Sequence, residues 1–158
     1  MLQNNISCAS EIICRLAKNE KVKSSITELQ KELLHSSEQF VWKMLNEHFN
    51  EHDLKTEFKS AWLFVLRKNT PSHAHYHPNS TQYTAVINGC GDGQFGKIKN
   101  SLQKFDPSNS DTLYVINRGM PHEFFPGDKD LVVLSLHTAN AEELIEINCS
   151  SGKERTYE

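Results

Sequence analysis

Short apolar runs separated by turn residues are the feature that most restricts the fold of this 158-residue chain. From about residue 58 onwards such runs recur, as AWLFVL, YTAVI, TLYVI, LVVLSL and LIEI. All seven glycines and all five prolines lie beyond residue 70, and turn pairs such as Asn88-Gly89 and Asp92-Gly93 separate the runs. This spacing is typical of short strands in a sandwich or a closed barrel. The later part of the chain is therefore predicted to be mainly β.

Residues 1 to 52 have a different pattern, without glycine or proline and with apolar residues at helical spacing. Two segments, Ser25-Ile-Thr-Glu28 and Ser36-Ser-Glu-Gln39, have the spacing of a helix capping box. We expect a helix to begin at each box, after an earlier helix near residues 12–16. The second of these helices would present one apolar stripe, made of Phe40, Val41, Met44, Leu45 and Phe49. The expected organisation is a helical N-terminal extension over 1–55, a β-barrel over 56–150 and a polar tail over 151–158.

Composition argues against several classes of function. The net charge is −3, whereas nucleic-acid binding needs a basic surface. No apolar run is long enough to span a bilayer, and the N-terminus does not have the pattern of a signal peptide. The four cysteines form no CxxC pair and are expected to be reduced thiols. We therefore expect a cytoplasmic protein that binds neither nucleic acid nor membranes.

Three histidines at alternate positions stand out in the stretch PSHAHYHPNSTQYTAVING. On a strand, His73, His75 and His77 would face the same side, and two of them could share a metal ion. The alternative is a polar, histidine-rich turn without a function. An HxH pattern alone is a weak signal, so the sequence around it matters.

The surroundings of this pattern resemble the first motif of the cupin superfamily. His75 and His77 are followed by Gln82 and then by Gly89, with the spacing of that motif. The family has Glu at the position of Gln82. A glutamine keeps a carbonyl oxygen but has no charge.

The second cupin motif has a weaker counterpart further along the chain. Gly119 and His122 match it, while Asp111, Asn117 and Pro126 occupy positions where the family has Gly, Pro and Asn. These three substitutions are in turns, where Asp and Asn are also suitable. The two motifs cover about residues 70 to 126, and the wider resemblance covers about 58 to 150.

The resemblance implies a cupin-type double-stranded β-helix, or jelly-roll barrel, preceded by the helices. It implies one divalent transition metal per chain, bound by His75, His77, Gln82 and His122. A ligand set rich in imidazole suits Fe²⁺, and also Zn²⁺, Mn²⁺, Ni²⁺ or Co²⁺. Because these four ligands are neutral, the site would keep the full +2 charge of the ion and prefer an anionic ligand.

Three functions are compatible with such a site. The first is a non-haem Fe(II) dioxygenase acting on a small, anionic organic molecule. The second is a non-redox isomerase, lyase or cyclase that uses the metal as a Lewis acid, and the third is a sensor that binds metal or ligand without catalysis. A homodimer is expected from the resemblance, and the sequence identifies no catalytic residue besides the ligands.

Strand parity predicts which side chains lie around the metal. Residues two apart on a strand share a face, which places several residues with the proposed ligands. The expected pocket or supporting residues are His73, Thr84, Val86, Phe124, His137, Trp62 and Phe64.

Overall fold

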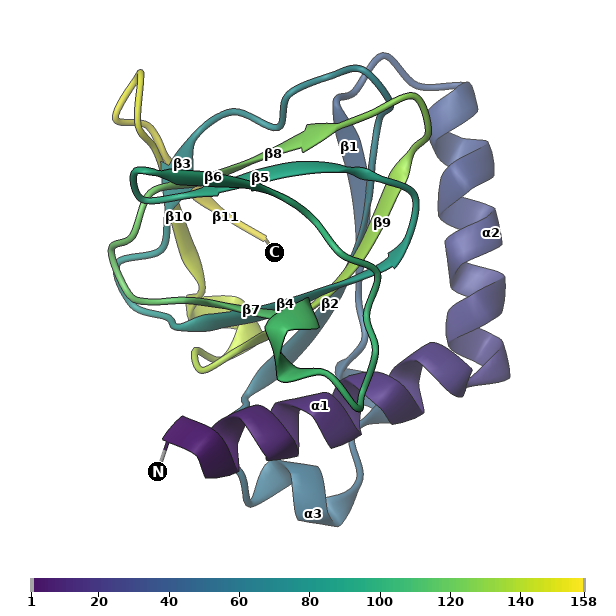
Figure 1. The fold of residues 1–158 in the computed structure, drawn as a ribbon, viewed down its shortest axis with the longest axis vertical. Coiled ribbons are helices and arrows are strands. Elements are labelled where there is room, and N and C mark those ends of the chain that lie inside the picture. The colour runs from purple at the N-terminus through teal and green to yellow at the C-terminus, as the bar shows by residue number, and fades with distance from the viewer. Residues whose placement is uncertain (1, 158) are drawn as a thin grey trace.

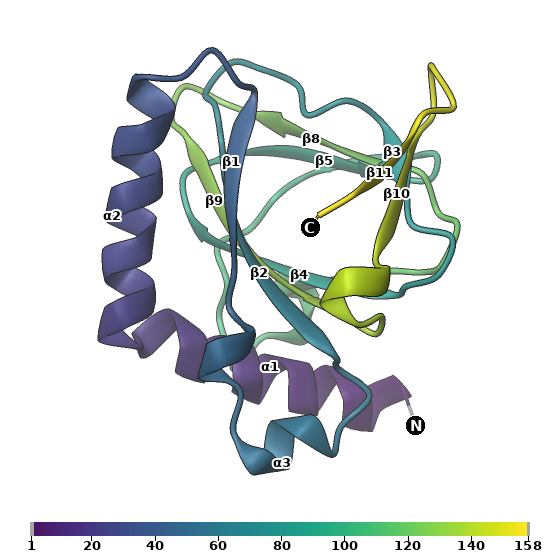
Figure 2. The same ribbon diagram turned by 180° about the vertical axis from the view of Figure 1, so that it is seen from behind.

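Two antiparallel β-sheets face each other, and two helices pack on the outside of one of them (Figures 1 and 2). The structure is a computed structural model that describes residues 2–157. The helices are α1 (Leu2–Lys18) and α2 (Glu20–Leu34), with a short α3 (Glu51–Leu54) and 3-10 turns at Asn46–His48, Ser110–Thr112 and Ala141–Glu143. None of the helices in this described part is long and apolar enough to cross a membrane.

The sheets account for the described strands. The first has the order β1 (Phe40–Met44), β2 (Ser60–Leu66), β9 (Leu131–His137), β4 (Gln82–Asn88), β7 (Leu113–Ile116). The second has the order β11 (Glu154–Thr156), β10 (Ile145–Asn148), β3 (His75–Tyr76), β8 (His122–Pro126), β5 (Gly91–Phe95), β6 (Ile98–Ser101). The predicted fold class, a mainly β barrel preceded in the sequence by helices, is confirmed.

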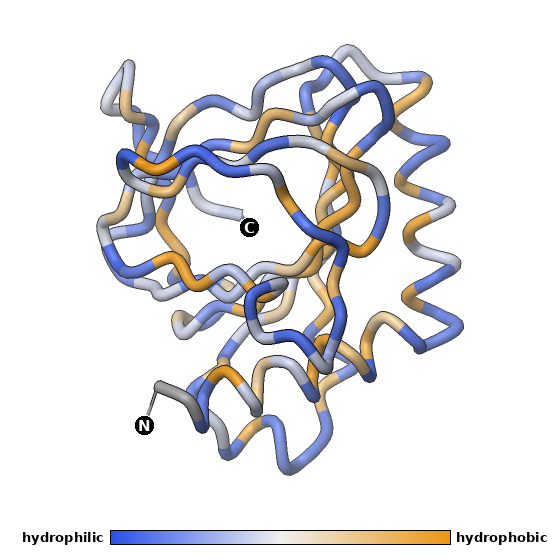
Figure 3. The backbone as a smooth tube through the Cα atoms, in the orientation of Figure 1, coloured by the Kyte–Doolittle hydropathy of each residue, from blue (hydrophilic) through white to orange (hydrophobic). Residues whose placement is uncertain are grey.

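The helices explain why the central strands are apolar on both faces. The outer face of the first sheet is covered by α1 and α2, so Leu63 of β2 and Leu134 of β9 are fully buried there with Ile13. An adjacent residue on each strand points into the barrel: Phe64 beside Leu63 and Val133 beside Leu134 belong to a second apolar cluster. Figure 3 shows the matching pattern on α2, which alternates between hydrophobic and hydrophilic residues.

The helix predicted over residues 36–49 is wrong. Phe40–Met44 is strand β1, which pairs along its whole length with β2, from Phe40 opposite Leu66 to Met44 opposite Trp62. The edge of β2 offers five residues of backbone pairing, and this tertiary interaction outweighs a local helical spacing. The residues also alternate as a strand requires, with Val41 in the cluster beneath the helices and Phe40 against the barrel interior.

Two further boundaries differ from the expectation. Helix α2 begins after Asn19, whose side chain accepts hydrogen bonds from the backbone N–H of Lys21 and Val22, so Ser25 lies inside the helix. The segment 151–158, expected to be a polar tail, contains β11, which pairs with β10. Tyr157, which follows β11, is buried because its aromatic ring packs against Trp42 and Trp62.

Candidate metal centre

Three imidazoles from two neighbouring strands meet at one end of the barrel. His75 begins β3, His77 follows its end, and His122 begins β8, where it lies opposite His75 in the strand register. One ring nitrogen from each lies within 4.8 Å of the other two. Three imidazole nitrogens this close can act together as ligands of one ion.

Backbone carbonyl groups determine which nitrogen each imidazole offers. The Nδ1 atoms of His75, His77 and His122 lie 3.2, 2.8 and 3.0 Å from the carbonyl oxygens of His73, Ile145 and Met120, respectively. A carbonyl oxygen only accepts, so each Nδ1 carries the hydrogen and each Nε2 keeps its lone pair. Histidines that bind metal ions commonly have this arrangement, in which the other ring nitrogen donates its hydrogen to a carbonyl or carboxylate oxygen.

Two buried polar atoms at this centre have no hydrogen-bond partner among the described residues. They are Nε2 of His122 and Oε1 of Gln82. The amide nitrogen of Gln82 uses both its hydrogens, at 2.7 Å to the Thr84 hydroxyl and 3.2 Å to the Ser135 hydroxyl. A buried acceptor without a partner costs free energy, and a metal ion would satisfy both atoms. The residues present therefore fit a divalent cation.

Burial favours the neutral form of His77, His122 and the neighbouring His137. Loss of solvent lowers the pKa of His77 to about 4, with repulsion from a charged His75 as a smaller cause. Burial also lowers the pKa of His122 and of His137 well below 6.5. A neutral imidazole is the form that binds a metal ion.

His137, at the end of β9, has the opposite tautomer. Its Nδ1 lies 2.9 Å from the hydroxyl oxygen of Ser80, and that oxygen already accepts from the backbone N–H of Thr138 and Ala139. A hydroxyl has two lone pairs and one hydrogen, and the backbone N–H groups use both lone pairs. The hydrogen has two acceptors in reach, Nδ1 of His137 at 2.9 Å and the carbonyl oxygen of Thr81 at 3.3 Å, and the shorter contact assigns it to His137. The Nε2 of His137 then carries a hydrogen and acts as a donor.

Three of the seven predicted pocket or supporting residues line one small cavity. The cavity has a volume of about 40 Å³ and lies next to the imidazoles of His75 and His77. Phe64 and Phe124, expected there from strand parity, line it, and so does His137. Thr84 is buried beside Gln82 and holds its amide, while Val86 is buried further along the same face.

Two predicted residues lie elsewhere. His73 has a left-handed backbone with φ of 71°, its exposed side chain contacts Gln39, and only its carbonyl group supports His75. Trp62 is fully buried beside Tyr157 and donates to the hydroxyl of Ser60. It packs behind the cavity wall.

Sequence reasoning missed several cavity residues outside the two motifs, and three of them carry aromatic or acidic groups. Phe40 comes from β1, while Glu146 and Tyr157 come from the C-terminal hairpin of β10 and β11. The alternation in LIEIN was a signal for Glu146, because a glutamate between two isoleucines on a strand faces away from both. The sequence did not indicate which sheet face that side would meet.

Comparisons with known proteins identify the fold. No protein-family model and no curated protein sequence matches the chain. Among solved structures, it resembles KdgF from Halomonas sp., with a TM-score of 0.50 and 16% identity over 65% of this chain and 81% of the other. It also resembles a cupin-2 domain from Rhodospirillum rubrum, with a TM-score of 0.50 and 16% identity over 76% and 66%.

A third similar structure is a mutant of the oxalate decarboxylase OxdC from Bacillus subtilis. The TM-score is 0.55 and the identity 11%, over 72% of this chain. The match spans only 29% of the decarboxylase chain. Together these likenesses show that the chain has the cupin fold.

Proposed function

We propose that this protein is a metal-dependent enzyme of the cupin fold that acts on a small organic molecule. One divalent transition metal would be held by the Nε2 atoms of His75, His77 and His122, with Oε1 of Gln82 as a fourth ligand. The pair of buried, unpartnered acceptors on Gln82 and His122 is the observation that carries this proposal. A polar turn without a function would leave no reason to bury them.

The residues around the proposed metal site suggest how a substrate would be bound. A bound metal would supply Lewis-acid or redox chemistry at an open coordination position. The N–H of His137 would donate to a substrate oxygen, and Phe64 and Phe124 would exclude water from that side. Lys153 and Arg155 line a recess outside the cavity and would attract an anion towards it.

A non-haem Fe(II) dioxygenase is the first candidate reaction class. Neutral imidazole and amide ligands favour the lower oxidation state of iron, because they do not offset the extra charge of the oxidised ion. A lyase that uses Mn²⁺, Zn²⁺ or Ni²⁺ is the second candidate, and the fold likeness to an oxalate decarboxylase supports it. A homodimer and a cytoplasmic location remain predictions from the sequence.

Metal analysis tests the proposal directly. The protein purified without added metal should contain about one divalent transition metal per chain, and His75→Ala and His122→Ala should each lose it. His35→Ala is the matched control, because His35 is exposed at the end of α2. Normal metal content in both site variants would reject the site.

Oxygen uptake then separates the candidate reactions. The Fe²⁺-loaded protein should consume oxygen with one member of a panel of small organic acids, thiols and diketones. Carbon dioxide release without oxygen uptake would favour the lyase. Metal binding with no turnover on any substrate would favour a sensor.

A further inference from the structure

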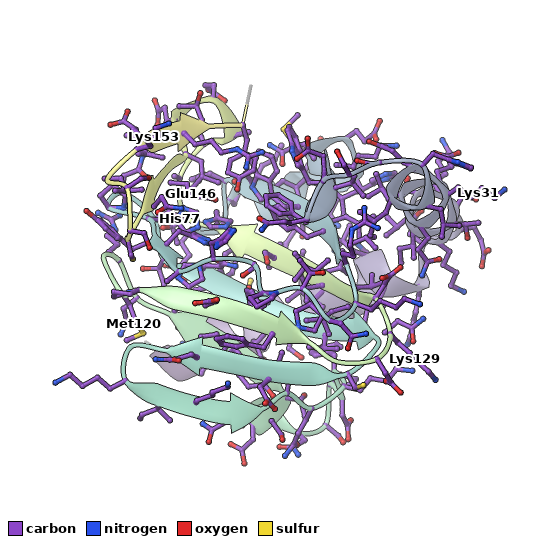
Figure 4. All side chains as sticks on the ribbon, turned by 90° about the horizontal axis from the view of Figure 1, so that it is seen from above. Lys31, His77, Met120, Lys129, Glu146 and Lys153 are labelled. Atoms are coloured by element: carbon purple, nitrogen blue, oxygen red, sulfur yellow. The ribbon has the colours of Figure 1, made fainter. Side chains whose placement is uncertain are left out.

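One carboxylate lies at the metal centre although neither motif contains it. Oε2 of Glu146 is 3.7 Å from Nε2 of His75, the atom proposed to bind the metal. Its side chain is 13% exposed and lines the same cavity as Gln82. Figure 4 shows Glu146 and His77 together at one end of the barrel, beside the hairpin that carries Lys153.

Among the described residues, no lysine or arginine forms a salt bridge with Glu146. Its contacts are the Tyr157 hydroxyl, which donates a short hydrogen bond to Oε2, and the ring of His75. A negative charge withdrawn from water is costly without a nearby positive charge. A divalent cation among the three imidazoles would provide it.

We propose that Glu146 supplies to the metal centre the negative charge that Gln82 lacks. The inference rests on the proposed metal site and adds a fifth residue to it. The carboxylate acts on the ion directly or through a ligand bound to it. The family pattern has its acid on the strand of Gln82, whereas this chain has it across the cavity on β10.

The charge of the site changes accordingly. Three imidazoles, one amide and one carboxylate leave an Fe²⁺ or Zn²⁺ centre at +1, whereas the sequence alone predicted +2. The attraction for an anionic ligand is therefore weaker, because the Glu146 carboxylate repels it across the cavity. A neutral or singly charged small molecule fits this centre better than a dianion.

Tyr157 positions the carboxylate. Its ring is buried against Trp42, with ring centroids 5.2 Å apart, and its hydroxyl points at Glu146. Burial raises the pKa of Tyr157 far above its ordinary value of 10, so the hydroxyl keeps its hydrogen and donates it. The C-terminal residues of the chain thus hold the acid in place against His75.

A charge-relocation experiment tests the proposal with Co²⁺ as the probe. Dissociation constants are measured by chelator competition for the wild type, Glu146→Gln, Gln82→Glu/Glu146→Gln and Glu154→Gln. Glu154 is the matched control, because it is an exposed carboxylate on the same hairpin. The visible spectrum of bound Co²⁺ reports coordination without any turnover.

Glu146→Gln should weaken Co²⁺ binding by about 10- to 100-fold. Glu154→Gln should change it by less than about threefold. Moving the charge back, in Gln82→Glu/Glu146→Gln, should restore binding to within about fivefold of the wild type. The Co²⁺ spectrum should change in Glu146→Gln and stay unchanged in Glu154→Gln.

Two results would overturn the inference. One is equal affinity for Glu146→Gln and Glu154→Gln, and the other is a double variant that binds no better than Glu146→Gln. Failure of the wild type to bind Co²⁺ would instead reject the proposed metal site itself.

The metal-free melting temperature of Glu146→Gln checks folding and should equal or exceed that of the wild type, because an unpaired charge has been removed. If Glu146→Gln does not fold, Tyr157→Phe is used in its place. Weaker Co²⁺ binding by Tyr157→Phe than by Glu154→Gln would support the inference. An unchanged Co²⁺ affinity would overturn it.

Discussion

At the scale of single residues, hydrogen bonds to the four clustered histidines give them different roles. Backbone carbonyls leave the Nε2 lone pairs of His75, His77 and His122 available. The Ser80 hydroxyl gives His137 the opposite tautomer. Four imidazoles in contact therefore divide into three acceptors and one donor, which suits a metal with a substrate-orienting neighbour.

Removing the Ser80 hydroxyl should change the tautomer of His137. In the metal-free wild type at pH 7.5, long-range proton–nitrogen NMR should find the hydrogen on Nε2. In Ser80→Ala, Nδ1 loses its donor, so the form with the hydrogen on Nδ1 should become populated. Ser72→Ala is the control, because Ser72 lines the cavity but bonds to the backbone of Phe124. A hydrogen on Nδ1 of His137 in the wild type would contradict the assignment.

At the scale of elements, α2 depends on a cap that lies six residues before the predicted one. Asn19 accepts from two backbone N–H groups at the start of the helix. Ser25 is buried in the second turn, where its hydroxyl accepts from Lys43 of β1 at 3.1 Å. The apparent capping box at Ser25 thus holds a contact between the helix and the sheet.

Asn19→Ala should lower the free energy of unfolding by about 1 kcal/mol, because two N–H groups lose their acceptor. Ser25→Ala should cost less, since the higher helix propensity of alanine offsets part of the lost bond to Lys43. Urea unfolding of the metal-free protein measures both values. A larger loss for Ser25→Ala than for Asn19→Ala would show that the cap has been misplaced.

At the scale of the whole molecule, the buried imidazoles make stability depend on pH. The pKa of His77 falls from 6.5 in the unfolded chain to about 4 in the folded protein, because burial disfavours its charged form. Between these values the unfolded state binds more protons, so acid favours unfolding. The contribution of His77 is fully present above pH 6.5 and is lost as the pH falls towards 4.

The metal-free protein should therefore become less stable between pH 6.5 and pH 4. His77 alone should account for about 3 kcal/mol of this loss, since each pKa unit corresponds to about 1.4 kcal/mol. Denaturant unfolding at several pH values measures the slope. His77→Gln should flatten it, while His35→Gln, at an exposed position, should leave it unchanged. Equal slopes for His77→Gln and the wild type would contradict the explanation.

Parts of the site could be predicted from the sequence, because side chains alternate between the two faces of a strand. The motif spacing predicted that His75, His77 and His122 would meet, and the structure brings them within 4.8 Å. Parity along a strand predicted that Phe64 and Phe124 would line the pocket, and both line the cavity. The expected meeting of His122 with the other two histidines came from the resemblance to the cupin motifs, whereas the pocket walls needed only the two-residue period of a strand.

Other features depended on which elements meet. The apolar spacing of residues 40–49 fits a helix as well as a strand, and only the free edge of β2 decided between them. No local pattern could show that β10 would lie against β3, which brings Glu146 to His75. The sequence by itself determined the strand-rich barrel and the imidazole cluster, because periodicity and motif spacing act within short segments. The tertiary structure decided the β1 strand, the tautomer of His137 and the carboxylate at the centre, because each depends on contacts between residues far apart in the chain.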